Sequence, residues 1–507
     1  MKSPRSQNPF LLVLLIVSLL GLLSLLQPGL TVGGVALRPV RLLADVLRPN
    51  PAAAAETLPP PNGPAGPAAP PDSVLTAQAA PPADSAEVAA VAKAPAVANL
   101  GGLDNFLAAL RQTKADGSPV RIAYFGDSMI EGDLITSDLR NSLQVAFGGS
   151  GVGYVPIHTV AADFRETIHE TASADWQEYN LVSPKLPAGF ALGISGHVFV
   201  PRVATAAADS TAAGGASWVR FQTGQRFAPV RRFARARLFY GPGAEPAEVL
   251  ATTDGHAVPH ALSGQAALNE LLLTPARPAR QLRLDFKTPG PRPVYGVSFE
   301  GTGGVVLDNF SFRGNSGMSL TRIPFRELAA FGKALDYRLV ILHYGVNVAD
   351  ARNKTYGWYE RAMTRVVDRM QRAFPAASIL IIGMSDKSSR LDGEFITDPS
   401  VPRLLAAQQL LAKHNHAAFW NLFEAMGGEN SMVSWVEDSP PLANRDYTHV
   451  NPRGAHRIAG LLFDYLMAEY QHPGQPAPAA PTPDSAARPA PAPTPPARVD
   501  SATSQVP

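Results

Sequence analysis

Three side chains suited to acyl transfer lie next to predicted strands and helices. Ser128 follows the apolar run Val120–Phe125, and Asp446 and His449 stand just before the last predicted helix. A neutral serine hydroxyl is a weak nucleophile, so it needs an imidazole as general base. The imidazole needs an orienting acceptor, which Asp446 can supply from three residues earlier in the same turn. The residue types therefore predict nucleophilic acyl transfer by a Ser128–His449–Asp446 triad.

The tetrahedral intermediate of acyl transfer carries an oxyanion that needs preorganised hydrogen-bond donors. Asn347 follows the apolar run Arg338–His343, so its side-chain amide is expected at the same sheet edge as Ser128. Together with the Ser128 backbone N–H and a glycine N–H, this amide can form an oxyanion hole. We expect Asp127 to accept backbone N–H bonds and hold the turn, rather than to act as an acid.

Short buried runs alternate with helical spacing on both sides of a β-rich middle. The first strand, Val120–Phe125, precedes a helix within Asp133–Phe147. Later strands are expected at 338–343, 378–384 and 417–423, and helices at 323–335, 358–374, 403–415 and 452–470, with Asn451 as N-cap of the last. Buried parallel strands separated by helices predict a doubly wound α/β sheet, whose sites lie at the carboxyl ends of its strands.

The β-rich middle covers residues 154–309. Its alternating or β-branched segments lie at 196–203, 218–222, 233–240, 281–286 and 294–299, with Gly/Pro turns between them. Short strands over such a length predict a β-sandwich inserted after the first strand and helix of the α/β domain. One segment carries Arg231, Arg232, Arg235 and Arg237. Either a solvated basic face or a contact with an acidic glycan fits this pattern.

Composition excludes several classes of function. The 507 residues include 44 basic and 42 acidic side chains, a balance that argues against a nucleic-acid-binding protein. With no cysteine, the chain can have no disulfide framework, thiolate zinc site or cysteine nucleophile. The chemistry must use oxygen or nitrogen groups.

The N-terminus has the pattern of a membrane or export segment. Lys2 and Arg5 precede an uncharged stretch whose most apolar part is Phe10–Leu26. Residues 1–37 are therefore expected to form a transmembrane anchor, with a cleaved signal segment as the alternative. Prolines concentrate in residues 49–98 and 471–507, which hold 23 of the chain's 48. We expect residues 38–98 to be a Pro/Ala-rich linker and 471–507 a disordered tail.

The motifs resemble those of the SGNH (GDSL-type) hydrolase superfamily. Gly126–Asp133 (GDSMIEGD) is similar to its first block, 345–347 (GVN) to its third, and 446–449 (DYTH) to its fifth. The second block, which supplies the oxyanion glycine, matches most weakly. Within residues 313–317 we favour Gly317 over Gly314 for this role. The resemblance implies catalysis without a cofactor or metal, with Ser128, Gly317 and Asn347 in the oxyanion hole.

The order of segments is most similar to bacterial peptidoglycan O-acetylesterases, in which the insert resembles a carbohydrate-binding module. This resemblance implies a hydrolase domain over residues 99–153 and 310–470, and a carbohydrate-binding-like insert over 154–309. It also implies that O-acetylated glycan, with peptidoglycan favoured, is the substrate. The protein would belong to the cell envelope, either anchored in the inner membrane with a periplasmic catalytic domain or exported to the periplasm.

Two other functions fit the same residues. A polysaccharide O-acetyltransferase would use the same triad and pass the acetyl group to a sugar instead of water. A catalytically silent envelope protein would bind glycan through the β-rich insert. Because the acyl-enzyme chemistry of an esterase and a transferase is shared, only the acceptor distinguishes these two functions.

Overall fold

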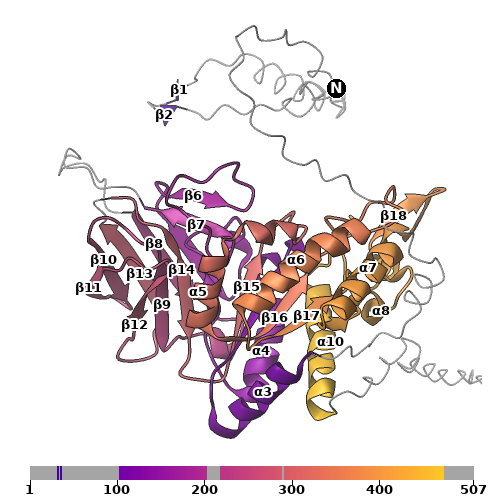
Figure 1. The fold of residues 1–507 in the computed structure, drawn as a ribbon, viewed down its shortest axis with the longest axis horizontal. Coiled ribbons are helices and arrows are strands. Elements are labelled where there is room, and N and C mark those ends of the chain that lie inside the picture. The colour runs from indigo at the N-terminus through magenta and orange to yellow at the C-terminus, as the bar shows by residue number, and fades with distance from the viewer. Residues whose placement is uncertain (1–30, 33–34, 37–101, 202–216, 288–289, 473–507) are drawn as a thin grey trace, which may run out of the picture. The chain divides into compact units, whose positions relative to one another are not determined.

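A computed structural model describes residues 31–32, 35–36, 102–201, 217–287 and 290–472 (Figure 1). The chain divides into two units, Met1–Ala80 and Pro81–Pro507. In the first unit, β1 (Thr31–Val32) pairs with β2 (Val35–Ala36) in antiparallel fashion.

Most of the predicted terminal segments fall outside the described residues. Only four residues of the expected anchor at 1–37 are described, none of the linker at 38–98, and only the first two of the tail at 471–507. Of the helices within the described ranges, none has both the length and the apolar character that a membrane span requires.

The second unit contains a five-stranded parallel sheet. Its strand order is β15-β3-β16-β17-β20, and every neighbouring pair is parallel. The strands are β3 (Val120–Gly126), β15 (Val305–Ser311), β16 (Tyr337–His343), β17 (Ser378–Ile382) and β20 (Ala418–Trp420). All seven residues of β3 are buried, which explains why its sequence is largely apolar; Arg121 is its one charged residue.

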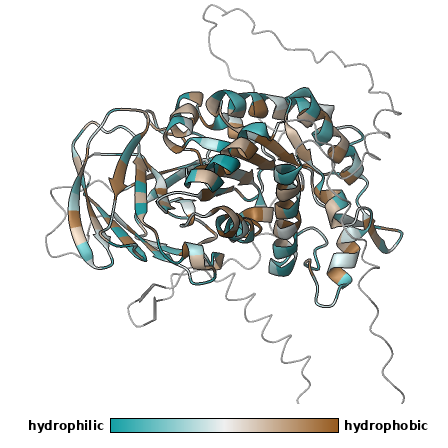
Figure 2. Ribbon diagram, turned by 90° about the horizontal axis from the view of Figure 1, so that it is seen from below, coloured by the Kyte–Doolittle hydropathy of each residue, from teal (hydrophilic) through white to brown (hydrophobic). Residues whose placement is uncertain are grey.

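Helices cover both faces of this sheet. Ile122 and Tyr124 pack with the helices on one face, and Ala123 and Phe125 belong to the core on the other. The first face is covered by α3 (Asp104–Asp116), α4 (Thr136–Phe147) and α10 (Pro452–Gln471), and the second by α5 (Phe325–Leu335), α6 (Gly357–Ala373) and α7 (Ser400–His414). Figure 2 shows apolar central strands enclosed by helices with hydrophilic residues outside. The predicted doubly wound sheet is confirmed.

The starts of helices α10 and α4 can be compared with the sequence-based prediction. The side chain of Asn451 accepts hydrogen bonds from the N–H groups of Arg453 and Gly454, so its predicted role as N-cap of α10 is confirmed. The helix expected from Asp133 begins instead at Thr136, because Ser128–Asp133 form a short 3₁₀ segment. Two short helices, α8 (Leu422–Met426) and α9 (Ser431–Glu437), follow β20.

Residues 153–300, here called the β-region, form two antiparallel sheets that pack on one apolar core. One has the order β11-β10-β13-β8-β5, and the other β12-β9-β14-β7-β6, with β4 paired to β14. The strands are β4 (Gly153–Val155), β5 (Ile168–Ala172), β6 (Gln177–Asn180), β7 (His197–Val200), β8 (Ser217–Thr223), β9 (Arg235–Tyr240), β10 (Ala247–Thr253), β11 (His256–Leu262), β12 (Asn269–Leu273), β13 (Gln281–Lys287) and β14 (Val294–Glu300). Phe221 of one sheet contacts Phe299 of the other, with ring centroids 5.1 Å apart. Face-to-face packing gives the sandwich arrangement expected from the sequence.

The predicted end of the β-rich stretch was placed too late. Strand β15 begins at Val305, inside the range 154–309, yet it pairs in parallel with β3. A short apolar run shows that a strand is buried, but not which sheet it joins. The α/β part of the chain therefore resumes at β15.

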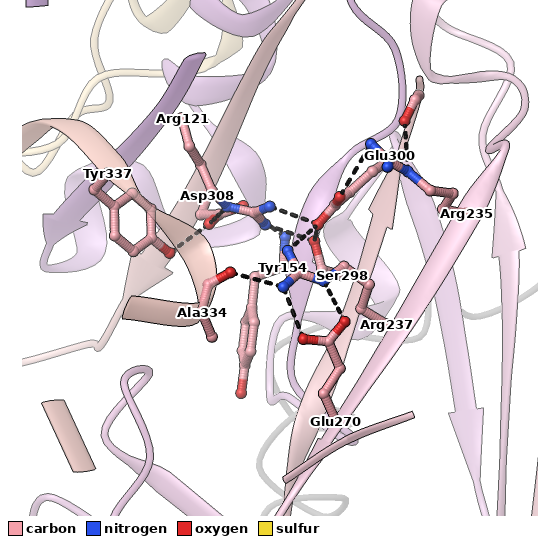
Figure 3. Close-up of polar contacts among 11 residues, drawn as sticks. Arg121, Tyr154, Arg235, Arg237, Glu270, Ser298, Glu300, Asp308, Ala334 and Tyr337 are labelled. Atoms are coloured by element: carbon pink, nitrogen blue, oxygen red, sulfur yellow. Dashed lines mark hydrogen bonds and ion pairs between the residues drawn. The ribbon is translucent and has the colours of Figure 1, made fainter. Parts of the chain in front are cut away.

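A buried ion network joins the β-region to the parallel sheet (Figure 3). Arg121 of β3 contacts Asp308 of β15 at 2.7 Å and Glu300 of β14 at 2.5 Å. Arg237 of β9 lies 3.3 Å from Glu300 and 2.8 Å from Glu270. Two arginines of the predicted basic face therefore bind within the protein, because Arg235 also donates to the Gly301 carbonyl at 3.1 Å.

Candidate active site

Ser128 is presented by a tight turn at the carboxyl end of β3. A Cβ on Gly126 would lie 2.9 Å from the Ile130 side chain and 3.1 Å from the His343 carbonyl, so this position requires glycine. Asp127 Oδ1 accepts the Met129 N–H at 3.0 Å, which confirms the predicted role of Asp127 in holding the turn. The hydroxyl of the next residue, Ser128, is left at the edge of the sheet.

The three predicted catalytic side chains lie in one hydrogen-bonded chain. Ser128 Oγ is 2.9 Å from His449 Nε2. On the other side of the ring, His449 Nδ1 is 2.8 Å from Asp446 Oδ2. This arrangement can pass the serine proton to the imidazole while a carboxylate orients the ring.

Local hydrogen bonds favour the charged form of Asp446. Partial burial alone would raise the pKa of its carboxyl group. The backbone N–H and ring of His449 and the N–H of Thr448 outweigh burial, and the pKa lies below its ordinary value. A carboxylate that stays ionised can stabilise the imidazolium formed during catalysis.

The loop that carries His449 is supported by a hairpin that the sequence did not reveal. Strands β18 (Ser388–Leu391) and β19 (Glu394–Thr397) form this hairpin. Phe395 stacks on Tyr447 with ring centroids 3.7 Å apart, and Ser388 donates its N–H to the Tyr447 carbonyl at 2.9 Å. The hairpin thus fixes the segment between Asp446 and His449.

Asn347 reaches the same site from the loop after β16. Its Nδ2 group donates to Asp127 Oδ2 at 3.0 Å and to the Asn315 carbonyl at 3.1 Å. Both amide hydrogens therefore have acceptors in the protein. To donate to an oxyanion, the amide must exchange one of these bonds.

Gly317, predicted as the oxyanion glycine, uses its N–H within its own loop. This N–H donates to Asn315 Oδ1 at 2.9 Å. A Cβ on Gly317 would lie 2.9 Å from both Met363 and Tyr344, so the residue is enclosed by side chains. Gly314 has φ +75° and open space where a Cβ would stand, and its N–H has no acceptor among the described residues. To donate to an oxyanion, the Gly317 N–H must exchange its bond to Asn315 Oδ1, as the Asn347 amide must exchange one of its own, and the assignment of Gly317 to the oxyanion hole stays a prediction.

Asp127 is a buried carboxyl group that forms no ion pair with any residue in the described ranges. It is 1 % exposed. Burial raises the pKa of Asp127 to about 6, although the Met129 N–H, the charge of His449 and the Asn347 amide favour its ionised form. The group that holds Asn347 thus titrates near neutral pH.

A cleft of about 440 Å³ opens over Ser128 and His449. Phe164 and Ala161, from the β-region, line it together with Arg313 and Glu131 of the α/β part. Sequence analysis missed these residues because only the folded chain brings the loop around Phe164 next to Ser128. Within the described ranges, no group of three or more His, Cys, Asp or Glu could hold a metal ion.

No family model matches this sequence, and no curated protein matches it. A solved structure of a peptidoglycan O-acetylesterase is similar, with a TM-score of 0.60 and 21% identity, over 74% of this chain and 99% of that one. The chain therefore has the fold of that enzyme, as the SGNH resemblance implies.

Two further similar structures are an acetyl xylan esterase and a family two carbohydrate esterase from Clostridium thermocellum in complex with cellohexaose. The first is 15% identical and covers 32% of this chain and 81% of its own; the second is 10% identical and covers 51% and 93%. Both have a TM-score of 0.24, which is too low to support a functional argument.

Proposed function

We propose that this protein is a serine esterase that removes O-acetyl groups from cell-envelope glycan, with peptidoglycan as the favoured substrate. The carrying observation is the continuous chain from Ser128 Oγ through His449 to Asp446, with bonds of 2.9 and 2.8 Å. Ser128, His449 and Asp446 line the cleft, where an ester can reach the Ser128 hydroxyl. The fold shared with a peptidoglycan O-acetylesterase supports the choice of a glycan ester.

In the first half of the reaction, Ser128 Oγ attacks the acetyl carbonyl carbon and its proton moves to His449 Nε2. Asp446 stabilises the resulting imidazolium through the ring N–H at Nδ1. The tetrahedral intermediate then collapses, the ester C–O bond breaks, and the sugar oxygen leaves with the proton from His449. The acetyl group remains as an ester on Ser128.

In the second half, His449 takes a proton from water as the water oxygen attacks the acetyl carbon. The bond to Ser128 Oγ breaks, and the serine recovers its proton from the imidazolium. Acetate is released. In an O-acetyltransferase, a sugar hydroxyl would replace this water.

The oxyanion of both steps requires donors near Ser128. We assign this role to the Ser128 N–H, the Asn347 amide and the Gly317 N–H, which would exchange its bond to Asn315 Oδ1. Loss of one such donor typically costs about 100- to 1000-fold in kcat.

The β-region and the N-terminus suggest where this activity acts. We assign glycan binding to the β-region and place the protein in the cell envelope, attached or exported through residues 1–37. Supporting features are the apolar run Phe10–Leu26 and the residues that the β-region gives to the cleft wall.

The direct test is acetate release from O-acetylated peptidoglycan by the full chain and by His449→Ala. We expect steady acetate release by the wild type without any acceptor sugar, and loss of release in the variant. A matched control is His414→Ala, since His414 pairs with Glu360 at 2.7 Å but contacts no serine in the described structure. Acetate transfer that depends on an added sugar would favour the transferase. No turnover of any acetyl ester would leave a silent binding protein.

A further inference from the structure

The side chain of Phe164 lies exposed in the wall of the catalytic cleft. Phe164 ends the short 3₁₀ segment that begins at Ala162, in the loop between β4 and β5. The cleft that it lines also contains Ser128 and His449. Phe164 is 73 % exposed, although phenylalanine is among the residues most often buried in folded proteins. Its ring is therefore accessible to a substrate bound at the nucleophile.

Phe164 contributes little to the packing of the free protein. It belongs to none of the three apolar cores of the described structure. Other phenylalanines of the β-region differ in this respect, because Phe221 and Phe233 are both buried in the core of the sandwich. Core packing therefore does not explain why an aromatic residue stands at position 164.

The loop of Phe164 rests on the segment that carries the nucleophile. Gly132, four residues after Ser128, has φ +64°. A Cβ on Gly132 would lie 3.4 Å from the Cβ of Phe164. Because Gly132 has no side chain, nothing separates this loop of the β-region from the segment Ser128–Asp133. This direct contact fixes the position of Phe164 beside the nucleophile.

A second exposed apolar side chain lies on the same loop. Val160 is 80 % exposed and lines a cavity of about 220 Å³, which shares Gly132 and Ala161 with the wall of the catalytic cleft. Single exposed apolar side chains are common on protein surfaces and need no explanation. Two on one loop, both in walls around the nucleophile, fit a surface that a bound ligand covers.

The sugar is the part of the proposed substrate that lies nearest to this surface. When the acetyl carbonyl is at Ser128 Oγ, the ester oxygen joins it directly to a sugar ring. A pyranose has C–H groups on its faces and hydroxyl groups at its edge, so one face can pack on an aromatic ring while the edge stays polar. Glu131 and Arg313 line the same cleft and provide polar groups there.

We propose that Phe164 is a specificity-determining residue, on whose ring the acetylated sugar packs. The inference rests on the proposed glycan esterase and deepens it, since it assigns the preference for a glycan ester to one side chain of the β-region. The contact involves the sugar and not the reacting carbonyl, so it stabilises the bound substrate and the transition state alike. Its loss should therefore act mainly on KM.

Hydrolysis of two acetyl esters by the full chain tests this role. O-acetylated peptidoglycan presents a sugar ring, whereas ethyl acetate presents the same acetyl group without one. For Phe164→Ala we expect kcat/KM to fall about tenfold on peptidoglycan and to stay unchanged on ethyl acetate. Phe164→Trp keeps an aromatic ring and should retain the wild-type preference. The control Val145→Ala removes an equally exposed apolar side chain of α4 and should change neither value.

Equal losses on the two esters in Phe164→Ala, or an unchanged value on peptidoglycan, would overturn the proposal. A binding measurement separates this failure from failure of the esterase. The tetramer of N-acetylglucosamine has no acetyl ester, so its affinity does not depend on turnover. Calorimetry should show binding about tenfold weaker in Phe164→Ala than in the wild type, and no binding or equal affinities would reject the role of Phe164. The expected difference without acetate release from any ester would reject the esterase alone.

Discussion

The two ends of strand β3 hold charged groups under opposite conditions. At the amino end, Arg121 lies between Glu300 and Asp308 in the buried network, and Arg237 completes it. At the carboxyl end, Asp127 is equally buried, but no arginine or lysine of the described residues forms an ion pair with it. One end of β3 thus carries a buried arginine with two carboxylate partners, and the other end carries the buried carboxyl group of Asp127 without an ion pair in the described structure.

The difference appears in the two buried acids. Burial alone would raise the pKa of Glu300, but Arg121 and Arg237 lower it to about 2. Burial raises the pKa of Asp127 to about 6, because only polar groups and the more distant His449 oppose it. The ion pairs of Arg121 with Glu300 and Asp308 connect the β-region to the parallel sheet. Incomplete pairing leaves groups at the site free to change protonation or partners.

The largest expected effect is the loss of activity on replacing Ser128, at the carboxyl end of β3. Ser128→Ala should lower kcat/KM for acetyl esters by about 10⁴-fold or more, since it removes the nucleophile. The midpoint of thermal unfolding should stay close to that of the wild type. Ester hydrolysis and a thermal melt measure both quantities. Retained turnover in purified Ser128→Ala would contradict the assignment, and Ser434→Ala on the exposed face of α9 is the control.

At the amino end, the effect should fall on stability instead. Arg121→Met leaves Glu300 and Asp308 buried without their main cation, which should cost about 3–5 kcal/mol in the free energy of unfolding. Urea denaturation measures this loss. The control Arg338→Met removes a surface pair with Asp336 and should cost about 1 kcal/mol or less. Equal losses of unfolding free energy in the two variants would show that the buried network does not stabilise the contact between the β-region and the parallel sheet.

Asn347→Ala tests the role of Asn347 as an oxyanion donor, separately from the role of Ser128 as nucleophile. We expect kcat to fall about 100- to 1000-fold with a smaller change in KM, because the donor acts on the transition state. Steady-state kinetics on p-nitrophenyl acetate separate the two constants. A change confined to KM would make Asn347 a ground-state binding residue.

The smallest effect concerns the titration of Asp127. Its folded pKa of about 6 exceeds the unfolded value of 3.8, so folding favours the protonated form. The stabilisation is complete below the unfolded pKa and is lost as pH rises through the folded pKa. Between about pH 7 and pH 5, wild type should gain about 1 kcal/mol relative to Asp127→Asn. Urea denaturation at the two pH values measures the gain, and parallel pH profiles of both proteins would refute it.

Local patterns were sufficient for the parallel sheet and the three predicted catalytic side chains. The buried run Val120–Phe125 and the N-cap at Asn451 each encode their own element. Ser128 could be placed at the carboxyl edge of the sheet because it directly follows a buried strand, and His449 could be paired with it because a serine nucleophile needs an imidazole as general base.

Features that depend on contacts distant in sequence could not be predicted. The pairing of β15 with β3 and the ion pairs of Arg237 with Glu270 and Glu300 join residues far apart in the sequence. No local signal shows that Asn315 Oδ1 accepts the Gly317 N–H.

The central claim is that His449 activates one hydroxyl of this chain. A serine-directed fluorophosphonate, followed by peptide mass spectrometry of the full-length protein, tests it most directly. We predict a single adduct on Ser128 that forms rapidly in the wild type and at least about 100-fold more slowly in His449→Ala. Modification at another residue, or equal rates in both proteins, would contradict the account.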